Sequence, residues 1–195
     1  MDASFVYRTR IRGVALLVAV ALAVGLAVTA AVVAFAPAAE ADHGPPIHIE
    51  LLTQHRHEFT DDVRAQIRAK PDGRPMGVAN LRDASNMMIA EITVDPGGMF
   101  PWHTHPGPVL VAVAEGDFVF IFADDCVERP YKAGEAFVDL GKDVHMALNP
   151  SETEDTVLIA TFLVAPDADA EDPRITVPVP AEEGAALDDE CGIDR

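Results

Sequence analysis

Three histidines are spaced so that they could bind one metal ion together. His103 and His105 are separated by a single residue. On an extended strand, residues i and i+2 point to the same face, which would bring both imidazoles together with their Cα atoms about 7 Å apart. A third histidine, His145, follows later in the chain and could come from another strand. Three imidazole nitrogens suit a divalent ion such as Zn, Cu or Fe, and the sequence does not choose among them.

The residues around these histidines resemble the two motifs of the cupin superfamily. The first motif runs glycine, five residues, His-x-His, three or four residues, glutamate, six residues, glycine. The second runs glycine, five residues, Pro-x-Gly, two residues, histidine, three residues, asparagine. The matching residues are Gly97, His103, His105 and Gly116 for the first motif, and Gly134, His145 and Asn149 for the second. The resemblance covers residues 76–165 and is closest to small single-domain, type-2-like cupins.

This resemblance implies an all-β fold, an antiparallel β-barrel or jelly roll. It also implies one divalent metal ion on His103, His105 and His145, with Asn149 as a hydrogen-bonding residue of the second shell or of a loop. Three positions depart from the pattern: Val109 stands where the motif has glutamate, and Leu140 and Lys142 replace the proline and glycine. Without the carboxylate, three neutral imidazoles leave the full dipositive charge on the ion. Affinity should then fall and open coordination positions increase.

Few other side chains of the motif region could take part in chemistry. Glu91 and Asp139 are the acids that could move a proton. Glu91 is a weak catalytic candidate, because a solvent-facing position on its strand is the simpler interpretation. Trp102 precedes the first ligand and should face the other side of its strand, as a packing residue. The pair His55 and His57 repeats the His-x-His spacing without a third ligand, so a solvated strand is expected there.

Two functions remain open on these observations. The first is a metal-dependent enzyme, such as an oxygenase acting on a small molecule. The second is a non-catalytic cupin module that holds a small ligand or a metal. In either case the apolar run 109–113 and Phe118, Phe120 and Phe122 would line or back an apolar cavity. The formal net charge of −18 argues against nucleic acid as a partner. Pairing of two copies through an edge strand is also open.

The first 41 residues read as a targeting segment. Three arginines precede an uncharged apolar run at residues 13–36, and Ala39-Glu40-Ala41 offers small residues for signal peptidase. The run is long enough to span a bilayer, so a cleaved signal peptide and an uncleaved transmembrane anchor both fit. Either way the domain would be secreted or held at the outer face of the cytoplasmic membrane. Cys126 and Cys191 suit an oxidising compartment, and a disulfide between them would tie the acidic C-terminal region to the domain.

Short β-type runs separated by turn signals fill the middle of the chain. Residues 42–75 should form an N-terminal arm with the first strands, residues 76–165 the barrel, and residues 166–195 an extended acidic arm outside the core. Residues 58–66 could instead form a short helix. The expected strands are 47–52, 63–69, 77–81, 86–94, 109–113, 118–123, 135–139, 144–149 and 157–164.

Overall fold

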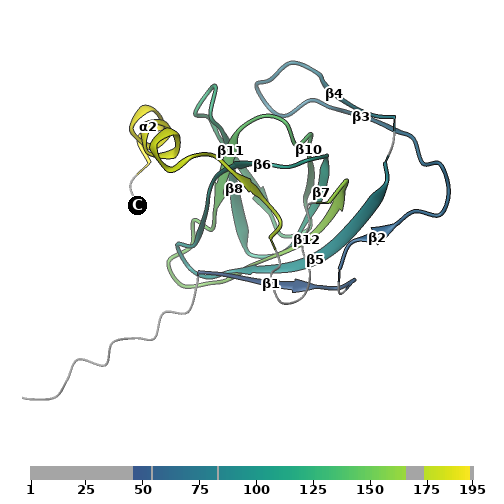
Figure 1. Ribbon diagram of the computed structural model, residues 1–195. Coiled ribbons are helices and arrows are strands. Elements are labelled where there is room, and N and C mark those ends of the chain that lie inside the picture. Colours follow the sequence, from purple (N-terminus) through teal and green to yellow (C-terminus); the bar gives the residue numbers. More distant parts are fainter. Residues whose placement is uncertain (1–45, 54, 83, 166–173, 194–195) are drawn as a thin grey trace, which may run out of the picture. The chain divides into compact units, whose positions relative to one another are not determined.

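The computed structural model describes residues 46–53, 55–82, 84–165 and 174–193. Their strands form two antiparallel sheets and a separate hairpin (Figure 1). The first sheet has the order β1-β5-β12-β7-β10, with β2 also paired to β5. The second has the order β13-β6-β11-β8-β9, and β3 pairs with β4 alone. This strand arrangement fits the jelly roll that the sequence predicted.

The strands of the first sheet are β1 (Ile47–Leu51), β2 (His57–Glu58), β5 (Asn86–Val94), β7 (Val109–Glu115), β10 (Ala136–Asp139) and β12 (Thr156–Leu163). Those of the second are β6 (Met99–Thr104), β8 (Asp117–Phe122), β9 (Glu128–Lys132), β11 (His145–Leu148) and β13 (Val177–Pro178). The hairpin consists of β3 (Ala65–Ala69) and β4 (Gly77–Leu81), and one helix, α2, spans Ala181–Cys191.

Alternation of side chains places the core between the two sheets. Along β5 every second residue from Asn86 to Val94 is buried, because successive side chains of a strand point to opposite faces. The buried side chains of β5, β7 and β12 meet those of β6, β8 and β11 in one apolar cluster. Strand β8 is buried on both faces. Phe118 and Phe120 belong to the main cluster, whereas Val119 and Ile121 pack on Trp102 in a second one.

Every expected strand is found within two residues of its predicted bounds. Strands β2, β6, β9 and β13 were not in that set, and two further regions differ. Residues 58–66 form no helix, since β2 ends at Glu58 and β3 begins at Ala65. The C-terminal region was expected to be extended and outside the core, yet it contains helix α2 and the buried residue Ile175. The acidic sequence of α2 has no apolar stripe that would predict a packed helix, because the helix buries none of its own residues. Its position depends on contacts made by residues at its end and outside it.

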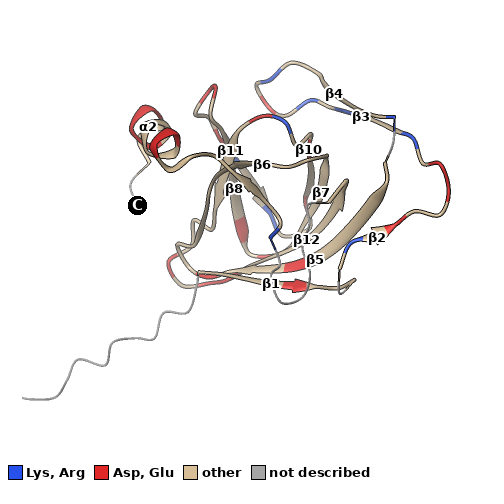
Figure 2. Ribbon diagram, in the orientation of Figure 1, with Lys and Arg blue, Asp and Glu red and all other residues tan. Residues whose placement is uncertain are grey.

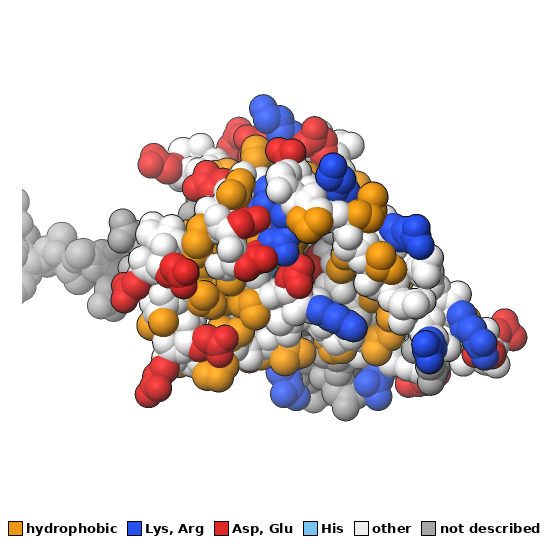
Figure 3. Space-filling view, turned by 90° about the horizontal axis from the view of Figure 1, so that it is seen from above, with side chains coloured by type: hydrophobic (Ala, Val, Ile, Leu, Met, Phe, Trp, Pro, Cys, Tyr) orange, Lys and Arg blue, Asp and Glu red, His pale blue; other side chains and the backbone are white. Residues whose placement is uncertain are grey.

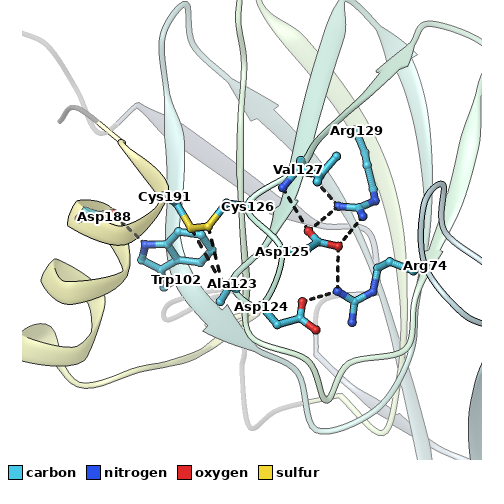
Figure 4. Close-up of a disulfide and its surroundings, with 10 residues drawn as sticks. All are labelled: Arg74, Trp102, Ala123, Asp124, Asp125, Cys126, Val127, Arg129, Asp188 and Cys191. Atoms are coloured by element: carbon cyan, nitrogen blue, oxygen red, sulfur yellow. Dashed lines mark hydrogen bonds and ion pairs between the residues drawn. A yellow bond between two sulfur atoms is a disulfide. The ribbon is translucent and has the colours of Figure 1, made fainter.

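A disulfide between Cys126 and Cys191 holds α2 against the second sheet, as predicted (Figure 4). The Trp102 indole donates a hydrogen bond to the Asp188 carboxylate of the helix, with 2.8 Å between Nε1 and Oδ1. Trp102 is therefore a packing residue under α2, on the face of β6 opposite its neighbour His103. The link explains why a helix without buried residues has a fixed place.

A cluster of opposite charges joins the β3–β4 hairpin to the second sheet (Figure 4). Arg74 pairs with Asp124, Asp125 and Asp143, and its guanidinium lies over the Phe122 ring at 4.0 Å. These partners come from segments far apart in the chain. The hairpin is thus attached to the domain by ion pairs as well as by packing.

Acidic and basic side chains are distributed unevenly along the elements. Acidic residues mark α2, whereas basic ones occur on β3 and in the loop between β3 and β4 (Figure 2). On the face seen in Figure 3, charged side chains stand between exposed hydrophobic ones. The predicted signal or anchor segment lies outside the described residues. Among the described helices, none is long and apolar enough to cross a bilayer.

Candidate metal centre

The three predicted histidines converge at one point between the sheets. His103 on β6 is paired directly with His145 on β11, so their side chains share one face. His105 follows immediately after β6. One ring nitrogen from each of the three lies within 4.8 Å of those of the other two. The i, i+2 spacing predicted this for His103 and His105, and the strand register supplies the third.

Each imidazole is held in the same tautomer by a backbone carbonyl. The Nδ1 atoms of His103, His105 and His145 lie 2.6, 2.8 and 2.9 Å from the carbonyl oxygens of Pro101, Ile175 and Asp143. A carbonyl only accepts hydrogen bonds, so each Nδ1 must carry the proton. Each Nε2 is left with a free lone pair. Orientation of ligating histidines by carbonyls is the usual arrangement around protein-bound metals.

Burial keeps all three rings neutral. Desolvation and the neighbouring His145 lower the pKa of His103 to about 3. Desolvation lowers the pKa of His105 to about 2, with His103 and His145 contributing. The pKa of His145 falls to about 4, again mainly through desolvation. Neutral imidazoles are the form that binds metal, so at neutral pH no proton has to leave before an ion can enter.

The histidines line a small apolar cavity between the sheets. Its volume is about 50 Å³, and each water needs about 10–15 Å³ on this measure. The cavity therefore has room for an ion and a few molecules the size of water. Its lining includes Phe100, Val109, Val111, Phe118, Phe120, Phe137, Leu158, Phe162 and Ile175. Phe118 and Phe120 thus line the cavity as predicted. Phe122 backs it, with its ring beside that of Phe120 and under the guanidinium groups of Arg74 and Arg129.

One carboxylate also lines the cavity. Asp139, at the end of β10, is 2% exposed, and its Oδ2 lies 3.6 Å from Nε2 of both His105 and His145. Its Oδ1 accepts a hydrogen bond from the Gly141 amide at 2.8 Å. Desolvation raises the pKa of Asp139 to about 7. The sequence named this residue only as an acid of the motif region, and nothing in its local pattern places it beside the histidines.

Gly141 fixes the turn between Asp139 and His145. Its φ of +87° lies in the left-handed region that favours glycine. A Cβ there would also collide with the Gly107 carbonyl oxygen. The Gly141 carbonyl accepts a hydrogen bond from the His105 amide at 2.8 Å. One turn thus positions both the carboxylate and one of the imidazoles.

The weak catalytic candidate Glu91 lies outside the site. On β5 its neighbours Ala90 and Ile92 are buried in the core, and Glu91 points to the opposite face beside Glu50 of β1. Glu91 therefore lies on the outer face of its strand, as the simpler interpretation predicted, and its carboxylate does not reach the cavity. His55 and His57 are exposed and stack on each other at 5.0 Å, within the part of the chain that the structure describes, with no third ligand.

Asn149 is fully buried but serves the loops at one end of the sheets. Its Nδ2 donates to the carbonyls of Val94, Asp95 and Glu154, and its Oδ1 accepts from the Ser151 amide. These contacts join the end of β5 to the turn before β12. Of the two roles expected for it, the loop role is the one that the structure shows.

Comparison with known proteins found one family match and several similar solved structures. The family model described as "Cupin domain" matches residues 90–162, which include all three histidines and Asp139. Similar solved structures include an RmlC-like cupin from Shewanella frigidimarina, at 19% identity over 64% of this chain and 81% of that chain (TM-score 0.39). A cupin-like protein from Thermotoga maritima has 20% identity over 52% and 72% (TM-score 0.39). KdgF from Halomonas sp. has 18% identity over 62% and 81% (TM-score 0.37). No curated protein matches this chain.

The strands, the paired motifs and the family match together identify residues 90–162 as a cupin domain.

Proposed function

We propose that this cupin domain binds one divalent metal ion through Nε2 of His103, His105 and His145. One observation carries the proposal: three neutral imidazoles, each fixed by a carbonyl at Nδ1, point their free lone pairs at one spot within 4.8 Å. Three unprotonated nitrogens cannot hydrogen-bond to one another, whereas one cation between them can accept all three lone pairs. Zn, Cu and Fe all accept such a donor set.

The His103→Ala/His145→Ala variant tests this proposal. Isothermal titration of Zn²⁺ into chelator-stripped wild-type protein should show one site per chain. In the double variant the site should be lost, since a single imidazole with a carboxylate holds zinc weakly. His55→Ala/His57→Ala is the matched control, because it removes two exposed histidines of the same spacing and should bind as the wild type does. Equal Zn²⁺ affinity in wild type and His103→Ala/His145→Ala would refute the proposal.

The cavity suggests how such a site would be used. We propose that it supports a metal-dependent oxidation of a small molecule, in the manner of an oxygenase. A bound ion would supply Lewis acidity or, if it is Cu or Fe, redox chemistry. The chain's own contribution is to hold the ion and exclude water with apolar side chains such as Phe118 and Phe162. Asp139 is the only carboxylate among the described residues of the lining, which leaves little capacity for acid–base hydrolysis.

The alternative is a module that holds an ion or a small ligand without turnover. An oxygenase needs an open coordination position beside the ion, whereas a non-catalytic module does not. Azide titration into Cu²⁺-loaded protein tests for that position. A new charge-transfer absorption would support the oxygenase proposal. No spectral change up to saturating azide would favour the non-catalytic module.

Export is also proposed, on the N-terminal segment and on the disulfide. A Cys126–Cys191 bond is expected in an oxidising compartment and not in the cytosol. Thiol alkylation of the protein in intact cells is the direct test. Both cysteines should resist alkylation until a reductant is added, and two reactive thiols in the native host would contradict export.

A further inference from the structure

The second oxygen of Asp139 is buried and has no hydrogen-bond partner. It is the one such side-chain atom among the residues that the structure describes. It lies 3.6 Å from Nε2 of His105 and 3.6 Å from Nε2 of His145. Both nitrogens lack a proton, because their rings are protonated at Nδ1. Lone pairs of three atoms therefore face one another in a buried site.

A cation would resolve this arrangement, and the spacing fits one. Ligands bound to a tetrahedral ion at 2.0–2.2 Å are about 3.4 Å from each other. The two separations of 3.6 Å between the Asp139 oxygen and the imidazole nitrogens are close to that value. The other carboxylate oxygen is occupied by the Gly141 amide, which holds the group in place. The carboxylate would thus offer a single oxygen to the ion.

The strand register relates Asp139 to the residue missing from the first motif. Asp139 of β10 is the direct partner of Val109 of β7. Residues opposite each other on antiparallel strands share a face, with Cβ atoms about 4.5–5.5 Å apart. Both side chains line the cavity. A carboxylate absent at position 109 is therefore present one strand away, on the same inner surface.

Resting on the metal binding proposed above, we propose that Asp139 is the fourth metal ligand, through Oδ2, in place of the acid that Val109 replaces. The site then holds three imidazoles and one carboxylate, and the net charge of the ion with its ligands falls from +2 to +1. The metal affinity should then be higher than the loss of the motif glutamate at Val109 alone would suggest. The ligand comes from the second motif and not from the first.

Asp139→Asn is the discriminating variant. The side-chain oxygen of the asparagine can still accept the hydrogen bond from the Gly141 amide, so the turn is kept. The negatively charged Oδ2, the proposed ligand atom, is replaced by an uncharged NH₂ group. We expect its Zn²⁺ affinity, measured by competition with a chelator, to fall at least tenfold. The Asp139→Asn/Val109→Glu variant should regain most of that loss, because it returns a carboxylate to the same face. Glu91→Gln is the matched control, since it removes one acid from the outer face and should bind as the wild type does.

The outcomes separate this inference from the proposed function. If His103→Ala/His145→Ala loses Zn²⁺ but Asp139→Asn binds as tightly as wild type, Asp139 is not a ligand and the three-histidine site stands. If the wild type binds no Zn²⁺, both proposals fail. A structure of the Zn²⁺-loaded wild-type chain gives an answer without any variant. Oδ2 within about 2.2 Å of the ion supports the inference, and a distance beyond about 3 Å overturns it.

Discussion

Breaking the Cys126–Cys191 disulfide is expected to destabilise the domain strongly. The two cysteines are 65 residues apart, and closing a loop of that length removes about 4 kcal/mol of chain entropy from the unfolded state. Reduction should therefore lower the free energy of unfolding by about 2–4 kcal/mol and the Tm by about 10 °C. Urea unfolding with and without dithiothreitol measures the first quantity. Trp102, the single tryptophan, is a suitable fluorescence probe because it packs under α2.

The Cys126→Ser/Cys191→Ser variant is the control for this experiment. It should be as unstable as the reduced wild type and should not respond to dithiothreitol. A change of less than about 1 kcal/mol on reduction would refute the loop argument. The same reduction should weaken Zn²⁺ binding by less than tenfold. The reason is that it loosens the C-terminal segment whose Ile175 carbonyl orients His105, without removing a ligand.

Two further predictions concern stability. Asn149→Ala should cost about 3 kcal/mol, because several buried backbone groups lose their partner, while one Zn²⁺ per chain is still bound. Loss of zinc in a folded Asn149→Ala protein would show that Asn149 acts on the site after all. Metal-free protein should lose stability as the pH falls from 6.5 towards 4. The pKa values of the three site histidines lie below 6.5 in the folded state, so the unfolded chain takes up protons first. Desolvation raises the pKa of Asp139 to about 7, so the folded state takes up this proton first and gains stability as the pH falls. This single group is outweighed by the three histidines. Denaturation midpoints that stay constant from pH 7 to 4.5 would contradict this.

The repeating patterns were readable from the sequence, and contacts between distant segments were not. Strand period placed His103 and His105 on one face, and the turn glycines bounded most strands correctly. The position of Asp139 depends on how β10 is registered against β7, which no local pattern specifies. Ile175 is a lone apolar residue in a polar segment, and its burial follows from the packing of the C-terminal segment on the domain. The sequence favoured an outer-face position for Glu91, and the alternating burial of β5 places its side chain there.

The most direct test of the metal site is the metal content of the protein as its host makes it. Inductively coupled plasma mass spectrometry should find about one divalent ion per wild-type chain and only background in His103→Ala/His145→Ala. The identity of that ion, Zn against Cu or Fe, would also decide between Lewis-acid and redox use. A wild-type chain with no more metal than the variant would contradict the account, and so would a variant that retains a full equivalent.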